Sequence, residues 1–239
     1  MKVIVIGATS GIGRELVRQM AGAGYDVAAT GRRIELLESL QTECDRPIAI
    51  QAMDVADTEV ARGQFLDLIA QMGGVDIVVL NAGVGEMTTR WEKEKQIMDI
   101  NATGFAALAN VAFHYFAKNN GGQIVGISSV AAVRAGGLSP MYHATKAFIS
   151  TYMEGLHYRA RKKSLPIVVT DIRPGFVKTP MTDQNDPKQM FWVASVEKAT
   201  QQIVQAIEQK KRVVYITKRW ALAARLMRWI PDFIYAKFA

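Results

Sequence analysis

A tyrosine and a lysine stand four residues apart at Tyr142 and Lys146, in the run YHATK. Four residues are about one helical turn, so on a helix both side chains lie on one face. A free tyrosine has a pKa of about 10, and a neighbouring ammonium group favours its phenolate form. Such a pair can exchange a proton with a substrate oxygen. The same spacing recurs at Tyr158 and Lys162, so the pair alone is not specific.

Ser129 distinguishes the two pairs, because it stands thirteen positions before Tyr142. It follows the apolar run Ile124–Ile127, which predicts a strand. The end of a strand and the start of the next helix can converge. The residue at the matching position before Tyr158 is Thr145, which we expect on the same helix, about 20 Å away. We therefore assign proton transfer to the first pair and a solvated helix face to the second.

A glycine-rich turn, GATSGIG at residues 7–13, follows the first predicted strand. Glycines let a pyrophosphate approach the backbone amides at a helix N-terminus, where the helix dipole favours anions. The spacing differs from G-x-G-x-x-G, and the lysine of a Walker loop is absent. The turn predicts a dinucleotide site, and a structural turn without a ligand is the alternative.

The second predicted strand ends at Thr30-Gly31-Arg32-Arg33, where dinucleotide folds meet the adenosine ribose. An acidic residue there binds both ribose hydroxyls, whereas an arginine accommodates a 2′-phosphate. We therefore expect Arg32 to favour NADP(H) over NAD(H). Arg33 is expected to do no more than begin a surface helix.

Short runs rich in Val and Ile alternate with stretches of helical spacing, and each run is typical of a strand buried on both faces. Alternating strands and helices predict a parallel sheet with helices on both faces. We expect one α/β domain at residues 1–217, followed by a tail at residues 218–239. The predicted strands are Val3–Ile6, Val27–Thr30, Ile48–Ala52, Val75–Leu80, Ile124–Ile127, Ile167–Ile172 and Val213–Ile216. The predicted helices are Ile12–Ala23, Ile34–Glu43, Val60–Met72, Trp91–Asn119, Met141–Lys163 and Val196–Gln209.

The composition excludes a disordered chain, because 49% of the 239 residues are hydrophobic and 21% are charged. The single cysteine, Cys44, cannot form an internal disulfide, and no His/Cys cluster has zinc-binding spacing. We expect no metal site and a cytoplasmic location, since no secretion signal or membrane span is visible. The net charge is +7, but the tail carries five basic residues against one acid. We therefore expect no nucleic-acid binding.

Taken together, these motifs resemble the short-chain dehydrogenase/reductase family. The resemblance implies a Rossmann-like, doubly wound parallel sheet of seven strands in one domain. It also implies a nicotinamide cofactor bound without metal, and assembly as a homodimer or homotetramer. The residues that carry it are GATSGIG, Asn81-Ala82-Gly83, Asn101, Ser128-Ser129, Tyr142 and Lys146, and Pro174-Gly175.

The resemblance assigns catalysis to four residues. Tyr142 is the proton donor or acceptor, Ser129 fixes the substrate oxygen, and Lys146 supplies the positive charge and holds the nicotinamide ribose. Asn101 holds a water that links Lys146 to solvent, with a structural role as the alternative. His114, His143 and His157 match no role in the family.

The resemblance also assigns a cofactor site. The residues from the glycine-rich turn surround the pyrophosphate, and Val177 and Thr179 meet the carboxamide end of the nicotinamide. Asp54 contacts the adenine, although a turn aspartate is the alternative, and a plain turn is the alternative for residues 81–83. The implied cofactor-binding residues are Gly7, Ser10, Gly11, Ile12, Gly13, Arg32, Asp54, Asn81, Ala82, Gly83, Tyr142, Lys146, Val177 and Thr179.

The resulting hypothesis is an NADP-dependent oxidoreductase that interconverts a carbonyl and an alcohol. A non-catalytic NADP-binding regulatory or scaffold protein is the alternative, and a sugar-nucleotide epimerase would need a larger substrate domain. We expect residues 180–195 to form a lid whose apolar side chains favour an apolar substrate, as does the loop Val130–Leu138. The lid side chains could equally pack on the protein's own core. They are Met181, Met190, Phe191 and Trp192.

The spacing of apolar residues in the tail predicts an amphipathic helix. Pro231 either interrupts this helix or begins a second short one. The apolar strip could pack on the protein's own sheet, on the lid or on a neighbouring subunit. Aromatic side chains beside arginines are also typical of a helix at a membrane surface, so we expect weak peripheral membrane contact through residues 218–239. The strip comprises Leu222, Leu226, Trp229, Ile230 and Phe233.

Overall fold

A parallel sheet of seven strands forms the centre of the protein in this computed structural model, which describes residues 1–183 and 190–236. The strand order is β3-β2-β1-β4-β5-β6-β7, and every neighbouring pair is parallel. The order reverses between β1 and β4, where doubly wound sheets open a crevice for ligands. The strands are β1 (Lys2–Ile6), β2 (Asp26–Gly31), β3 (Ala49–Ala52), β4 (Ile77–Leu80), β5 (Gly122–Ile127), β6 (Ile167–Pro174) and β7 (Val213–Ile216).

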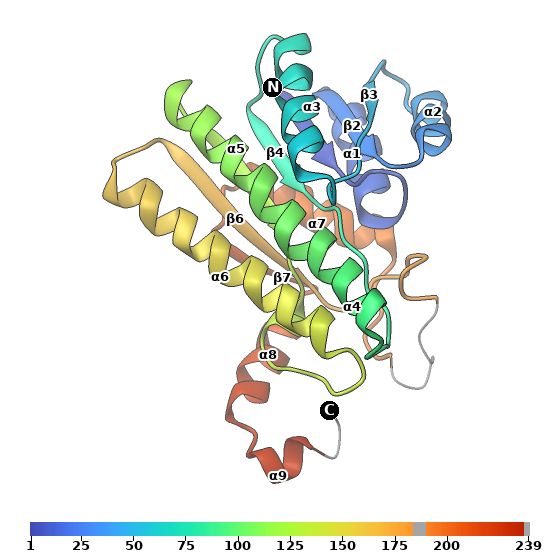
Figure 1. Ribbon diagram of the computed structural model, residues 1–239, viewed down its shortest axis with the longest axis vertical. Helices are drawn as coiled ribbons and strands as arrows, with labels where there is room; N and C mark the ends of the chain where they lie inside the picture. The colour runs from blue at the N-terminus through green and yellow to red at the C-terminus, as the bar shows by residue number, and fades with distance from the viewer. Residues whose placement is uncertain (184–189, 237–239) are drawn as a thin grey trace.

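Helices cover both faces of the sheet (Figure 1). On one face, α3, α5 and α6 enclose a core that includes Phe65, Phe113 and Phe116. On the other face, α1, α2 and α7 enclose a second core around Leu16, Leu37 and Ile203. The helices are α1 (Gly11–Gly22), α2 (Ile34–Glu43), α3 (Thr58–Gln71), α4 (Trp91–Met98), α5 (Phe105–Lys118), α6 (Pro140–Lys162), α7 (Val196–Glu208), α8 (Arg219–Trp229) and α9 (Asp232–Tyr235).

The seven-stranded, doubly wound sheet in one α/β domain is confirmed, and so is each predicted strand to within two residues. Two predictions about the elements were wrong. The strands β3 and β7 lie at the two ends of the sheet and are not buried on both faces, because the helices cover these end strands incompletely. The expected helix Trp91–Asn119 is divided by a π-helical turn at Asp99–Gly104, named η1, between α4 and α5.

The tail forms two helices that leave the sheet at the carboxyl end of β7 (Figure 1). Pro231 stands between them, at the N-terminal cap of α9, as expected for a residue that cannot continue a helix. Within α8, Trp220 and Ala224 are buried, whereas Leu222 and Leu226 are exposed. The apolar strip therefore does not pack on the protein's own sheet. No helix in the described ranges is long and apolar enough to cross a bilayer.

The fully buried ring of Phe116 supports the first core and should dominate its stability. We expect Phe116→Ala to lower the free energy of unfolding by about 3–5 kcal/mol, because it leaves a cavity in a packed interior. Urea denaturation measures this change. Phe233→Ala is the matched control, since this ring is 74% exposed, and it should change stability little. Equal losses in the two variants would contradict the described packing.

Candidate active site

The three proposed catalytic side chains meet at the carboxyl edge of the sheet. Ser129 follows β5 and caps the short 3₁₀ helix η2 (Val130–Ala132), where its Oγ accepts a hydrogen bond of 3.1 Å from the Ala131 amide. Tyr142 lies in the first turn of α6, and Lys146 follows one turn later. The Ser129 side chain interacts with Tyr142 closely enough to favour its phenolate form. The predicted convergence of a strand end and a helix start is therefore present.

Lys146 is buried, with only 5% of its surface exposed. Its Nζ donates a hydrogen bond of 3.1 Å to the Ile127 carbonyl and lies 5.6 Å from the centre of the Tyr142 ring. Burial lowers the pKa of Lys146 to about 8, and the Asp171 carboxylate opposes that shift. The ammonium group therefore loses its proton far more readily than a lysine in water.

The acidity of Tyr142 differs from our expectation. We expected the Lys146 charge to lower the tyrosine's pKa, but burial raises the pKa of Tyr142, and the interaction with the Ser129 side chain opposes this increase. The physical reason is that desolvation penalises the phenolate. In this state Tyr142 holds its proton and can donate it to a substrate oxygen.

Asn101 is fully buried and lies in the π-helical turn η1. Its Oδ1 accepts from the Val84 amide, and its Nδ2 donates to the Val84 carbonyl, both at 2.8 Å. Nδ2 also donates to Thr145 Oγ1, on the turn of α6 that carries Lys146. The side chain thus joins the loop after β4 to α6. This supports the structural alternative, and the water-holding role stays a prediction.

The glycine-rich turn is fixed from two sides. The Thr30 carbonyl accepts the amides of Gly7 and Ala8, and Asn81 Nδ2 donates to the Gly7 carbonyl at 2.6 Å. Gly7 has a φ of +90°, and a Cβ there would come within 2.5 Å of the Ala82 backbone. A Cβ on Gly13 would come within 2.1 Å of the Gly7 carbonyl oxygen. The turn can therefore approach β4 only with glycines at these positions.

The turn and the first residues of α1 fit an anionic ligand. Ser10, Gly11 and Ile12 are partly exposed at the helix N-terminus. The first turn of α1 carries no acidic residue, and the Ser10 side chain makes no capping hydrogen bond within the described part of the chain. Free amides and a hydroxyl group at a helix N-terminus suit a pyrophosphate. Thr179 lies against Gly11, so the loop after β6 borders the same site.

The two arginines after β2 behave differently from each other. Arg32 is exposed. Arg33, which we expected only to begin a surface helix, turns back so that its Nη2 donates to Thr9 Oγ1 at 3.2 Å. Sequence reasoning missed this contact, because the two residues are 24 positions apart and no spacing rule links them. Both arginines are therefore candidates for contact with a phosphate beside the glycine-rich turn.

Asp54 and Val177 use part of their hydrogen-bonding capacity within the protein. The Asp54 carboxylate accepts from the Ala56 amide in a turn, which is the alternative that we gave for it. The Val177 side chain is buried in the second core, and its carbonyl accepts from Thr182 Oγ1. Contact of Asp54 with adenine, and of Val177 with nicotinamide, stay predictions.

A second buried polar network lies behind the site. Ser128 Oγ donates to Asp171 Oδ1, and Arg173 Nε donates to Asp171 Oδ2 at 2.7 Å. Arg173 also donates to the Tyr215 hydroxyl group. Asp171 is therefore held in place from two sides and acts on the charge of Lys146 from a fixed position.

The substrate side of the site is bordered by three segments. The ring of Tyr142 and the sulfur of Met181 both lie close to Gly85. Sequence reasoning did not identify Gly85 as part of the site. Phe191 and Trp192 pack against Phe176 and Trp220, so this part of the expected lid contacts the protein's own aromatic side chains. Residues 184–189 of the expected lid lie outside the described residues.

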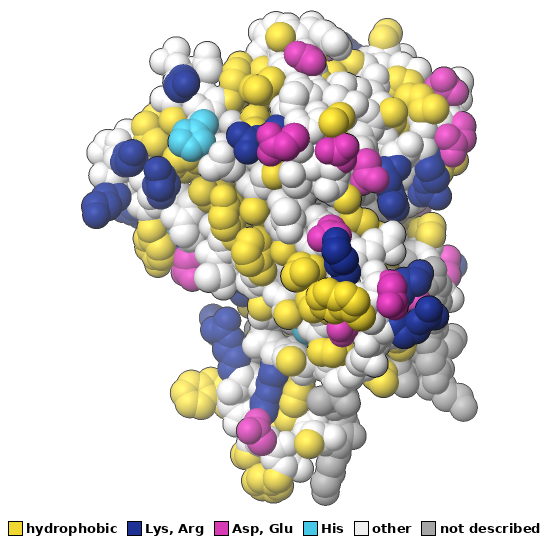
Figure 2. Space-filling model, viewed as in Figure 1, with side chains coloured by type: hydrophobic (Ala, Val, Ile, Leu, Met, Phe, Trp, Pro, Cys, Tyr) yellow, Lys and Arg dark blue, Asp and Glu magenta, His cyan; other side chains and the backbone are white. Residues whose placement is uncertain are grey.

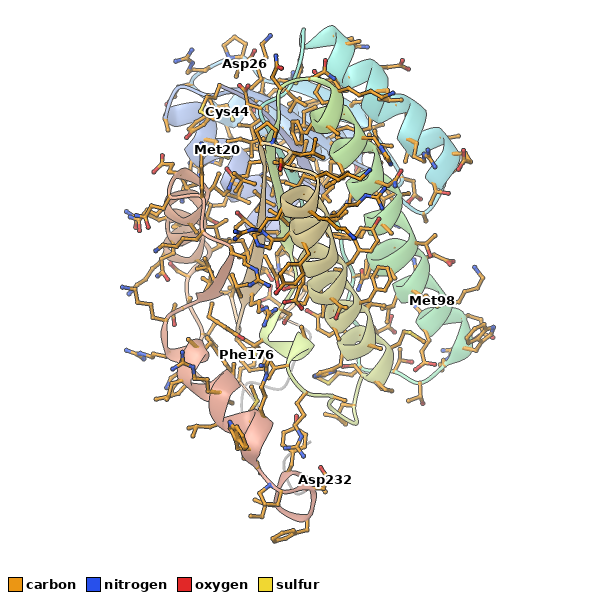
Figure 3. All side chains as sticks on the ribbon, turned by 90° about the vertical axis from the view of Figure 1, so that its left-hand side faces the viewer. Met20, Asp26, Cys44, Met98, Phe176 and Asp232 are labelled. Atoms are coloured by element: carbon orange, nitrogen blue, oxygen red, sulfur yellow. The ribbon has the colours of Figure 1, made fainter. Side chains whose placement is uncertain are left out.

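The loop after Ser129 is attached to the tail. Arg134 donates to the carbonyl groups of Met227 and Ile230 and pairs with Asp232. Its guanidinium group also lies 3.9 Å from the centre of the Tyr235 ring. Figure 3 shows Phe176 beside the start of α8 and Asp232 at the far end of the tail. The tail thus contacts the loop after Ser129 through Asp232 and the loop after β6 through Trp220.

Comparisons with known proteins agree with this geometry. A family model described as short chain dehydrogenase matches residues 1–190. An uncharacterized oxidoreductase of Myxococcus xanthus is 38% identical over 77% of this chain and 74% of its own. An NADP-dependent 3-hydroxy acid dehydrogenase of Escherichia coli is 31% identical over 74% of this chain and 73% of its own. A short-chain dehydrogenase from Sphingobium yanoikuyae, solved in complex with NADPH, superposes with a TM-score of 0.82 at 21% identity, over 97% of this chain and 96% of that one.

Replacing Asp171 tests its influence on the pKa of Lys146. Its carboxylate favours the charged form of Lys146, so we expect Asp171→Asn to move the pKa of Lys146 below about 8. An NMR titration of the lysine ε-carbons measures the titration midpoint of Lys146. The signal of Lys146 is identified by its loss in Lys146→Met. Asp67→Asn, at an exposed position of α3, is the control. A midpoint that does not move in Asp171→Asn would contradict this role.

Proposed function

Because the chain belongs to the short-chain dehydrogenase family, we propose that this oxidoreductase uses NADP(H) to interconvert a carbonyl compound and an alcohol. The observation that carries the proposal is the meeting of Ser129, Tyr142 and Lys146 at the carboxyl edge of the sheet, beside the glycine-rich turn. A module that only binds the nucleotide would not need this arrangement of a proton donor, a hydrogen-bonding hydroxyl group and a buried cation.

The protein's own residues would handle the proton. When bound, the nicotinamide cofactor supplies or accepts the hydride. Tyr142 donates its phenolic proton to the carbonyl oxygen during reduction and accepts it back during oxidation. Ser129, whose side chain interacts with Tyr142, holds the same oxygen. Lys146 places a positive charge beside the ring and stabilises the phenolate that proton transfer leaves behind.

The preference for NADP(H) is supported by Arg32 and Arg33 at the end of β2. Arg33 contacts Thr9 of the glycine-rich turn, and Arg32 is exposed next to it in the sequence. A guanidinium group here can pair with a 2′-phosphate, which NAD(H) lacks. The E. coli relative is named as NADP-dependent, and the S. yanoikuyae structure contains NADPH. Both agree with the proposed preference.

The substrate is proposed to be an apolar ketone, aldehyde or secondary alcohol. Met181 lies near Gly85 and Tyr142, and Phe176 and Phe191 line the neighbouring loop after β6. These side chains offer apolar surface close to the proton donor. The E. coli relative acts on 3-hydroxy acids, so compounds of that class belong in the same substrate panel.

Assembly as a homodimer or homotetramer is supported by an apolar groove between α5 and α6. Phe113, Phe148, Tyr152 and Leu156 line it. Figure 2 shows hydrophobic side chains along this face of the molecule. A second copy that covered the groove would bury these side chains away from water.

Replacing the proton donor tests the proposed reaction. We expect Tyr142→Phe to lower turnover by about 10²–10⁴-fold and to leave NADPH binding nearly unchanged, because only the proton transfer is lost. The assay follows NADPH absorbance with a panel of ketones, aldehydes, secondary alcohols and 3-hydroxy acids.

Tyr158→Phe is the matched control, because Tyr158 lies on the exposed side of the same helix and should be dispensable. Retained turnover in Tyr142→Phe would overturn the assignment. If the unchanged protein bound NADPH but turned over no member of the panel, the result would favour a nucleotide-binding module.

Arg32→Ala tests the cofactor preference. We expect the Kd for NADPH to rise by roughly 10–150-fold and the Kd for NADH to change little, since a charge-assisted hydrogen bond to the 2′-phosphate is lost. Fluorescence titration of both cofactors measures the two constants. Arg33→Ala serves as the comparison, because Arg33 contacts Thr9 in the same region. A larger loss of NADPH affinity in Arg33→Ala would transfer the role to that residue.

A further inference from the structure

The tail presents an apolar strip that no part of the described chain covers. Trp220 and Ala224 are buried against the body of the protein. At 3.6 residues per turn, Leu222, Leu226 and Trp229 lie on roughly the opposite side of α8. Leu226 is 58% exposed and Trp229 is 86% exposed. The strip continues into α9 through Phe233 and Ile234, both of which are exposed.

Basic side chains flank this strip. Lys218, Arg219, Arg225 and Arg228 are all exposed, and none of the four forms an ion pair with a residue that the structure describes. Around α8, Arg219 lies on one side of the strip and Arg225 on the other. The acid of this segment, Asp232, is already paired with Arg134. The surface is therefore both apolar and strongly cationic, and Figure 2 shows the two kinds of side chain next to each other on the lower lobe.

We propose that α8 and α9 bind the surface of a bilayer that contains anionic lipids. Trp and Phe side chains insert at the boundary between head groups and acyl chains, while arginines beside them pair with lipid phosphates. On α8 the exposed apolar side chains share one side, and Arg219 and Arg225 flank them. Charge complementarity thus identifies the partner as an anionic lipid surface.

A second copy of the chain is a poorer partner for this surface. A two-fold interface places the same patch of both copies face to face. The four basic residues of one tail would then oppose those of the other, with no free acid among the described tail residues to balance them. Like charges across an interface cost free energy, whereas an anionic bilayer gains from the same charges.

The attachment of the tail determines how the bound protein would lie. α8 begins at the carboxyl end of β7, the edge of the sheet at which Ser129 and Thr179 also lie. Arg134 holds α8 and α9 against the loop that follows Ser129. A protein bound through the tail would therefore hold the substrate side of its site close to the bilayer, where apolar compounds concentrate.

Co-sedimentation of the full chain with vesicles tests the proposal without any substrate. We expect binding to vesicles of phosphatidylcholine and phosphatidylglycerol, little binding to phosphatidylcholine alone, and loss of binding at high salt. Leu226→Glu/Trp229→Glu and Arg225→Glu/Arg228→Glu should each lower partitioning by at least about tenfold.

Two double variants are the matched controls. Val60→Glu/Leu66→Glu changes apolar residues of α3 that are 53% and 49% exposed, and Lys198→Glu/Lys211→Glu changes exposed cations away from the tail. Both should bind vesicles as the unchanged protein does, and circular dichroism checks that each variant is folded.

Three outcomes would overturn the proposal. The unchanged protein could fail to bind vesicles, the tail variants could bind as well as the controls, or binding could be equal for anionic and uncharged vesicles. Analytical ultracentrifugation adds a fourth: a smaller assembly in the tail variants, without vesicle binding by the unchanged protein, would identify the strip as an interface between copies. Each of these results is independent of turnover, so it leaves the proposed reaction untouched.

Discussion

All seven strands run in the same direction, and the rest of the structure depends on this constraint. A parallel sheet delivers the carboxyl end of every strand to one edge, and each connection must return to the opposite edge through a helix. The glycine-rich turn after β1, Arg32 after β2 and Ser129 after β5 therefore lie at one edge although they are far apart in the sequence. The tail follows β7 and begins at that edge too.

Burial controls the chemistry that this edge can perform. It lowers the pKa of Lys146 and raises the pKa of Tyr142, so the proton affinities of the two groups move apart and the lysine releases its proton before the tyrosine does. Ser129 and Asp171 each oppose one of these shifts. Asp171 can do so because Ser128 and Arg173 hold both of its carboxylate oxygens. The hydrogen bonds of Ser128 and Arg173 to Asp171 thus keep this carboxylate where it raises the pKa of Lys146.

The sequence predicted the fold well, because buried parallel strands are continuous apolar runs that differ clearly from helical spacing. It also predicted that Ser129, Tyr142 and Lys146 converge. It did not predict the π-helical turn at Asp99–Gly104, since a shift in backbone hydrogen bonding leaves no periodic pattern. The predicted direction of the Tyr142 pKa shift was wrong, because the shift depends on how deeply the ring is buried, and burial depends on the packed structure. The contact of Arg33 with Thr9 depends on a side-chain conformation that spacing does not specify.

The link between Arg134 and Asp232 joins residues that are 98 positions apart. Arg134 belongs to the loop that follows Ser129, and Asp232 belongs to α9, the last helix that the structure describes. Together with the contact from Tyr235 to Ala135, the link makes these two segments a single structural unit. A protein engineer who transplanted this tail onto a related enzyme would have to transplant the loop as well, because either segment alone would lose the partner that gives it its shape.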